Sequence, residues 1–87
     1  MIDVERIKLI ENRLRQAFSP SELSVISESH LHAGHAGAKT GRGHFALTIK
    51  AEALSHKSRV EQHRLIYTAL GDLMETDIHA LRITINP

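Results

Sequence analysis

The sequence predicts a single α+β domain, in which one three-stranded mixed sheet carries its helices on one face. Three observations lead to this prediction. The chain has 87 residues, which is enough for one domain. The spacing of its apolar residues switches between helical and strand periods in the order α-β-β-(short α)-α-β. The strand after the second long helix can lie parallel to a neighbour, which makes the sheet mixed. We therefore assign residues 1–87 to one domain.

Residues 3–18 have the apolar spacing of an amphipathic helix. The apolar positions recur every three or four residues, at Val4, Ile7, Ile10, Leu14 and Phe18. Asp3 is the expected N-cap, because its carboxylate can accept hydrogen bonds from the free amides of the first turn. Pro20 disfavours helical geometry at the residue before it, so we expect the helix to end near Ser19.

Two strands joined by a long loop are predicted next. Residues 22–28 and 44–50 both alternate between apolar and polar side chains, which is typical of half-buried strands. Between them, from His30 to Gly43, four glycines fall within ten positions and favour a loop over a regular element. We expect this loop to be the most mobile part of the free protein, since ordering so many glycines is entropically costly.

The C-terminal half predicts a short helical turn within residues 51–57, then a helix and a last strand. Ser58 and Glu61 have the spacing of a capping box, so the helix should begin at Arg59. It should run to Leu70, or as far as Met74, with a glycine at position 71 that ends or weakens it. Its expected inner stripe consists of Val60, His63, Tyr67, Leu70 and Met74, widened by Leu65 or Ile66. Residues 79–85 alternate again and predict the third strand.

The composition excludes several classes of protein. Eleven Lys and Arg against ten Asp and Glu give a net charge of only +1. Nucleic-acid binding would therefore need a local basic face. The absence of Cys excludes disulfides, thiolate ligands and a Cys nucleophile. No apolar run approaches the roughly 20 residues that span a bilayer, so we expect no membrane association and a cytoplasmic location. The sequence also lacks a serine elbow and a phosphate-cradling loop, so we expect no enzyme.

Histidine is the unusual residue of this chain. Seven histidines occur in 87 residues, and four of them lie between positions 30 and 44. Imidazole is ready to bind metals at cellular pH, because its unperturbed pKa is about 6.5. The spacing of His30, His32 and His35 leaves a zinc site as an open alternative, although a Gly-rich loop gives these side chains no fixed geometry. The other expectations are a turn or strand-face residue for His30 and His44, an exposed His56 and a hydrogen-bonded core His63.

Three segments together resemble the BolA family. The first runs from Glu28 to His35 and is followed by Gly43-His44-Phe45. The second runs from Ser58 to Tyr67 and is similar to the family signature of serine, arginine, valine and then histidine–arginine. The third is His79-Ala80-Leu81, which resembles the triplet that opens the last strand in the family. The order and spacings agree, and the resemblance covers nearly the whole chain.

The resemblance implies a fold similar to the class II K-homology domain, in agreement with the order of elements above. It also implies a non-enzymatic adaptor that forms a heterodimer with a monothiol glutaredoxin and shares a [2Fe–2S] cluster with it, in iron–sulfur trafficking or iron sensing. Glutathione would come with the partner. On this resemblance the ligands are His79 and His32, with the nearby His35 as an alternative to His32. We expect the chain to be a monomer when alone and to need no cofactor for folding.

DNA binding is the alternative function, because some bacterial members of the family are described as transcription regulators. The residues expected to contact double-stranded DNA are Lys57, Arg59 and Arg64, around the start of the second long helix. Arg13 and Arg15 are further candidates for the same basic face. Phosphate contacts of this kind give weak, salt-sensitive binding.

Overall fold

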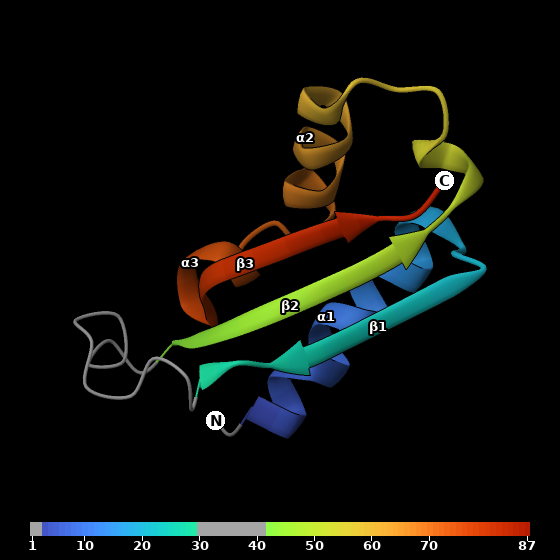
Figure 1. The fold of residues 1–87 in the computed structure, drawn as a ribbon. Helices are drawn as coiled ribbons and strands as arrows, with labels where there is room; N and C mark the ends of the chain where they lie inside the picture. The colour runs from blue at the N-terminus through green and yellow to red at the C-terminus, as the bar shows by residue number, and fades with distance from the viewer. Residues whose placement is uncertain (1–2, 30–41) are drawn as a thin grey trace.

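A computed structural model describes residues 3–29 and 42–87 of the chain. Figure 1 shows its elements in chain order: α1 (Asp3–Phe18), β1 (Glu22–Ser27), β2 (Gly43–Lys50), the 3-10 turn η3 (Glu52–Leu54), α2 (Arg59–Leu70), α3 (Leu73–Thr76) and β3 (Ile78–Ile85). The predicted order is confirmed. Gly43 belongs to β2 and not to the loop, and Met74 lies in the separate helix α3. Residues 30–41 of the predicted loop, and the predicted mobility of the loop, lie outside the described residues.

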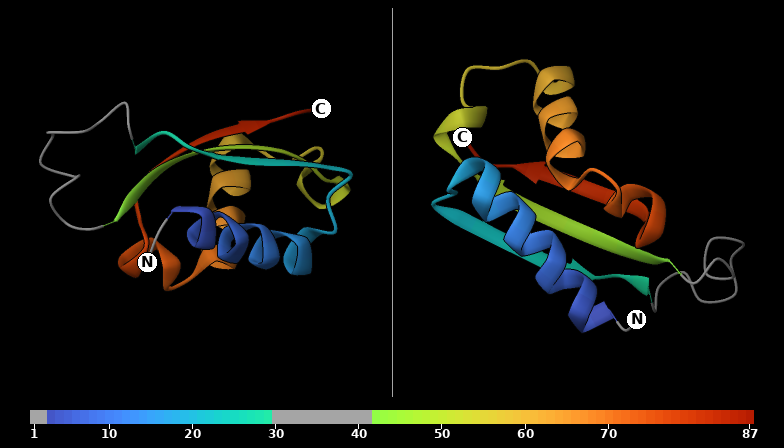
Figure 2. Two further views of the ribbon diagram at one scale, coloured as in Figure 1. Left: turned by 90° about the horizontal axis from the view of Figure 1, so that it is seen from below. Right: turned by 180° about the vertical axis from the view of Figure 1, so that it is seen from behind.

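The three strands form one mixed sheet in the order β1-β2-β3, as predicted. β1 runs antiparallel to β2, with Val25 opposite Leu47. β3 runs parallel to β2, with Leu47 opposite Ile83. Figure 2 shows that the helices lie on one face of this sheet and leave the other face open. None of the described helices is long and apolar enough to cross a membrane.

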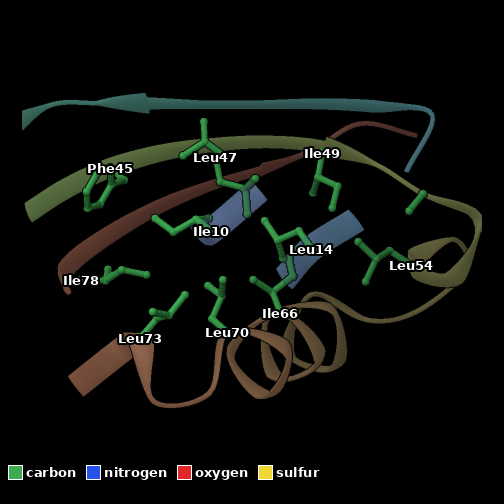
Figure 3. Packing of buried hydrophobic residues seen from close by; sticks show 12 residues of the cluster. Ile10, Leu14, Phe45, Leu47, Ile49, Leu54, Ile66, Leu70, Leu73 and Ile78 are labelled. Carbon is green, nitrogen blue, oxygen red and sulfur yellow. The ribbon is translucent and has the colours of Figure 1, made fainter. Parts of the chain in front are cut away.

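The hydrophobic core lies between the sheet and the helices (Figure 3). β2 is the central strand, and its alternate side chains all point into this core, which is why Phe45, Leu47 and Ile49 are buried. The helices contribute the fully buried residues Ile10 and Leu14 from α1, Leu54 from η3, and Ile66 and Leu70 from α2. Full burial of one such side chain contributes about 1.5–3 kcal/mol.

The predicted inner stripe of α2 is wrong in part. Val60 and Tyr67 are 64% and 41% exposed, whereas Ile66 and Leu70 are fully buried. The helix ends at Gly71, which adopts φ 54° as the C-cap, and the chain turns there so that α3 packs against the same core. Apolar residues occur all around α2, so periodicity alone does not identify the buried face.

Gly43 is required by a close approach of the core. A Cβ atom at this position would lie 2.6 Å from Cζ of Phe45, well inside van der Waals contact. The aromatic ring therefore packs over the glycine main chain at the first residue of β2. This contact explains why the first residue of β2 is a glycine.

The predicted start of α2 is confirmed. The Ser58 side chain accepts a hydrogen bond from the Glu61 main-chain N–H at 3.2 Å. The Ser58 hydroxyl also donates to the Glu61 carboxylate at 3.2 Å, so both side chains of the capping box are engaged.

Candidate metal centre

His79 lies at an irregularity in the pairing of β2 with β3. Gly43 lies opposite Ile78 and His44 lies opposite Ala80, so His79 is the extra residue of a β-bulge. The bulge interrupts the usual alternation of side chains. Ile78 is buried, whereas His79 and Ala80 are both exposed. The bulge therefore turns His79 out of the core and presents its ring to solvent.

His44 is the nearest aromatic neighbour of His79 within the described residues. The two ring centroids are 5.1 Å apart, with an angle of 49° between the ring planes. His44 comes from β2, where it points away from the core side chain of Phe45, and it is only 8% exposed. The prediction of a strand-face residue is confirmed, but its position beside His79 was missed.

Arg42 fixes the orientation of the His79 ring. Its guanidinium lies 3.3 Å from Nδ1 of His79 and donates a second hydrogen bond to the main-chain oxygen of Glu75 at 3.4 Å. A guanidinium has no acceptor, so this contact is a hydrogen bond only in the tautomer in which Nδ1 accepts. A metal ion that binds through Nδ1 therefore has to displace Arg42.

The carboxylate of Asp3 connects α1 to the last residue of β1 and to the segment that follows this strand. Asp3 is the first residue of α1 and not the residue before it, so the predicted N-cap is wrong. Its carboxylate accepts hydrogen bonds from the hydroxyls of Ser27 and Ser29, each at 2.6 Å. Burial raises the pKa of Asp3, but hydrogen bonds from both serines and from Arg6, together with the Arg6 charge, lower this pKa below 3.8 overall.

Arg6 extends this polar network to the residues just before His79. Its guanidinium contacts Asp3 at 3.3 Å and Asp77 at 3.2 Å. A hydrogen bond from the Thr76 hydroxyl lowers the pKa of Asp77, burial opposes this, and Arg6 lowers it further. The main-chain oxygen of Asp77 accepts the N–H of Gly43 at 2.9 Å. The network thus holds the start of β3 against the start of β2.

The described residues include one of the three predicted metal ligands. His79 occupies the position that the sequence predicts, while His32 and His35 lie outside the described residues. No group of three or more His, Cys, Asp or Glu side chains able to hold a metal occurs within residues 3–29 and 42–87. His79, with His44 packed against it, is therefore one candidate ligand of a half-site, which would need ligands from elsewhere to bind a metal or a cluster.

The predicted basic residues gather in part around α2. Lys57, Arg59 and Arg64 are all exposed. Arg59 and Arg64 border a shallow cavity of about 650 Å³, whose wall also includes His63, Val60, Tyr67 and Thr68. The prediction of a core His63 is wrong, because its ring is half-buried at the rim of this cavity.

Arg13 does not belong to this basic face. Its guanidinium donates to the main-chain oxygen of Leu70 at 2.9 Å and contacts Asp72 at 3.0 Å. These residues lie at the C-terminal end of α2, whereas Lys57 and Arg59 lie at its start. Arg13 therefore joins α1 to the turn after α2.

Taken together, the sheet, its helices on one face and the histidine pair define a small α+β domain with a candidate histidine metal half-site. The family model described as BolA-like protein matches residues 14–87. The chain therefore belongs to the BolA family, as its three motif segments predict.

Known proteins and structures support this assignment. The chain is 40% identical over 79 residues to SufE-like protein 1, chloroplastic/mitochondrial, of Arabidopsis thaliana, a match that covers 85% of this chain and only 21% of the plant protein. It is 34% identical over 74 residues to the DNA-binding transcriptional regulator BolA of Escherichia coli K12, covering 85% and 68%. The solved BolA domain of SufE1 from Arabidopsis thaliana superposes with a TM-score of 0.81 at 38% identity, covering 93% and 90%.

Proposed function

We propose that this chain is a non-enzymatic adaptor, which pairs with a monothiol glutaredoxin and holds a shared [2Fe–2S] cluster in iron–sulfur trafficking or iron sensing. The observation that supports the proposal best is the exposed His79 on its bulge, with His44 packed 5.1 Å away. A ligand on a strand edge is held by the sheet, so it can meet a partner without reorganisation of the chain. We further propose that the complex is cytoplasmic and that the free chain is a monomer.

The chemistry of the available side chains suits this role. The chain has no Cys, so the thiolates would come from the glutaredoxin and its glutathione, while this chain offers imidazoles. When bound, the cluster supplies an iron centre of mixed thiolate and imidazole ligation, as in Rieske-type sites. His79 would be the fixed ligand, and His32 or His35 the second. His44 restricts the His79 ring by packing against it.

Anaerobic reconstitution with a monothiol glutaredoxin tests the proposal. The apo chain, the glutaredoxin and glutathione are mixed with iron and sulfide, and visible absorption and circular dichroism are recorded. We expect a spectrum that differs from that of the glutaredoxin homodimer, and a one-to-one complex by size-exclusion chromatography. A spectrum identical to that of the glutaredoxin alone, with no complex, would contradict the proposal.

DNA binding is a second candidate, supported by the exposed Lys57, Arg59 and Arg64 and by the printed name of the Escherichia coli relative. Reversal of both charges, Arg59→Glu with Arg64→Glu, should weaken binding of duplex DNA, and this difference should shrink as salt increases. Lys8→Glu is the matched control on the solvent face of α1. Equal affinities for the double variant and the control would exclude α2 as the DNA-binding helix.

A further inference from the structure

β3 has one edge that no strand pairs with in the described part of the chain. The strand order is β1-β2-β3, so β2 covers only one side of β3. The N–H of Asn86 points toward β2 and donates to the oxygen of Ile49 at 2.9 Å. Main-chain groups alternate in direction along a parallel strand, so those of Ile83 and Ile85 point to the open edge. These groups form a template for an added strand.

The strand itself lacks three features that usually protect an exposed edge. Natural edge strands are often short, interrupted by proline or defended by an outward charge. β3 has eight residues, as many as the central strand β2, and contains no proline. Its one charged side chain, Arg82, makes an ion pair with Glu28 across the sheet. The edge from Leu81 to Ile85 is therefore open to pairing.

A groove lies between residues 83–85 of β3 and the first turns of α2, which runs at a steep angle to the strand (Figure 1). The β3–α2 groove has a volume of about 250 Å³ and is lined by Arg59, Gln62, His63, Ile83, Thr84 and Ile85. It continues past Gln62 and Ile85 into a second hollow of about 360 Å³, beside His56 and Leu54. An extended chain paired with β3 would thus have room for the side chains that it turns toward α2.

The charge of the groove indicates what occupies it. Arg59 and His63 line it, His56 lies at its continuation, and no described lining residue is acidic. Arg59 also stands in the first turn of α2, where the helix dipole disfavours a positive charge, so its position is not explained by helix stability. A second copy of the chain would bring Arg59 of both copies together. An acidic occupant is complementary.

A polypeptide fits this groove better than a nucleic acid. The open edge offers alternating donors and acceptors, which match another peptide main chain. Proteins that bind single-stranded nucleic acid usually gain affinity from stacking of the bases on aromatic side chains. The described residues of the groove include no Phe, Tyr or Trp. Arg59 is also the only arginine or lysine among them, so phosphate contacts would be few.

We propose that the β3–α2 groove binds an extended acidic peptide segment of a protein partner, which adds a strand to the sheet at the outer edge of β3. Ile85 lies about 20 Å along the strand from His79, given a rise of roughly 3.3 Å per residue. The groove is therefore separate from the candidate metal centre. An adaptor with both sites can engage two partners at once, but the groove does not depend on the cluster.

The test uses the full apo chain without glutaredoxin or iron. The probe is a short synthetic peptide in which valine alternates with glutamate, with blocked ends and a fluorescent label. Two matched probes replace glutamate by lysine, or methylate the main-chain nitrogens on the edge that would face β3. We expect binding of the acidic probe alone, with the amides of Ile83 and Ile85 protected from hydrogen exchange in the complex.

Charge reversal on α2 separates this groove from the other face of the helix. Arg59→Glu should lower the affinity for the acidic probe about five- to tenfold, as expected for the loss of one partly exposed ion pair. Arg64→Glu changes the same charge on the same helix but does not line the groove, so it should keep the affinity. Equal loss in both variants, or equal binding of the methylated probe, would overturn the proposal. Displacement of the peptide from the Ile83 edge by oligothymidine would also overturn it and assign the groove to nucleic acid.

Discussion

The hydroxyl of Ser29 donates a 2.6 Å hydrogen bond to the carboxylate of Asp3. The hydroxyl oxygen of Ser29 also accepts a hydrogen bond from the main-chain N–H of His44 at 3.1 Å. One side chain thus joins the first turn of α1, the end of β1 and the start of β2. Since His44 packs against His79, the state of the Asp3 carboxylate bears on the position of the candidate metal centre.

We predict that the protein loses stability as the pH falls below about 4, the usual pKa of an unfolded Asp. The pKa values of Asp3 and Asp77 are lowered in the folded protein, so the unfolded chain binds more protons in this range. The stabilisation is complete above the unfolded pKa and is lost as the pH passes down through the folded values. Urea unfolding at a series of pH values measures the slope.

Asp3→Asn should make this slope shallower, because it removes one of the two carboxylates. Asp72→Asn is the matched control, since Asp72 is exposed and its contact with Arg13 lies at the surface. If both variants keep the slope of the parent chain, the Asp3 network does not account for the acid sensitivity.

We predict that Gly43→Ala destabilises the fold by about 1–3 kcal/mol, the usual cost of overpacking a core. The added methyl would fall 2.6 Å from the Phe45 ring, which has to move. Urea unfolding measures the change. In a Phe45→Leu background the ring is absent, so the same Gly43→Ala change should cost less. An equal cost in both backgrounds would mean that the strain comes from the main chain.

For the shared cluster, we predict unequal contributions from the histidines. His79→Ala should abolish the mixed spectrum, since no neighbour on the strand can replace a ligand placed by the bulge. His32→Ala should weaken it, and the double change of His32 and His35 should weaken it more. Visible circular dichroism of each anaerobic complex provides the measurement. An unchanged spectrum and cluster lifetime for His79→Ala would show that the ligand assignment is wrong.

We predict that the isolated chain folds without metal. Its core is built from aliphatic side chains and Phe45 between sheet and helices, and none of the described core residues is a candidate ligand. Thermal unfolding followed by far-ultraviolet circular dichroism should show the same cooperative transition before and after treatment with a chelator. Loss of the transition would mean that a metal contributes to folding.

The sequence predicts most of the fold because the decisive signals are local. The capping box of Ser58 and Glu61, and the alternation in β2, are features of adjacent residues. The buried face of α2 cannot be predicted in this way, because Val60 and the ring of Tyr67 offer apolar surface as Ile66 does, and tertiary packing, including that of α1 on α2, decides between them. Local patterns cannot rank such equivalent faces.

The candidate site is less predictable because it depends on contacts between distant segments. His44 and His79 meet through the parallel register of β2 and β3 and through a bulge, and neither leaves a mark in residue spacing. Arg13 similarly contacts Asp72, which lies 59 positions away in the sequence. The charge of such a residue can be read from the sequence, but its partner cannot.

The parallel pairing of β3 with β2 also determines when the histidine pair can exist. β1 and β2 are joined as an antiparallel pair, but β3 reaches β2 only after the chain has passed through η3, α2 and α3. During synthesis on the ribosome, His44 is therefore made well before His79 can lie beside it. A nascent or partly folded chain lacks the pair. In the proposed complex, His79 would therefore be presented on its bulge, with His44 packed against it, only after the sheet is complete.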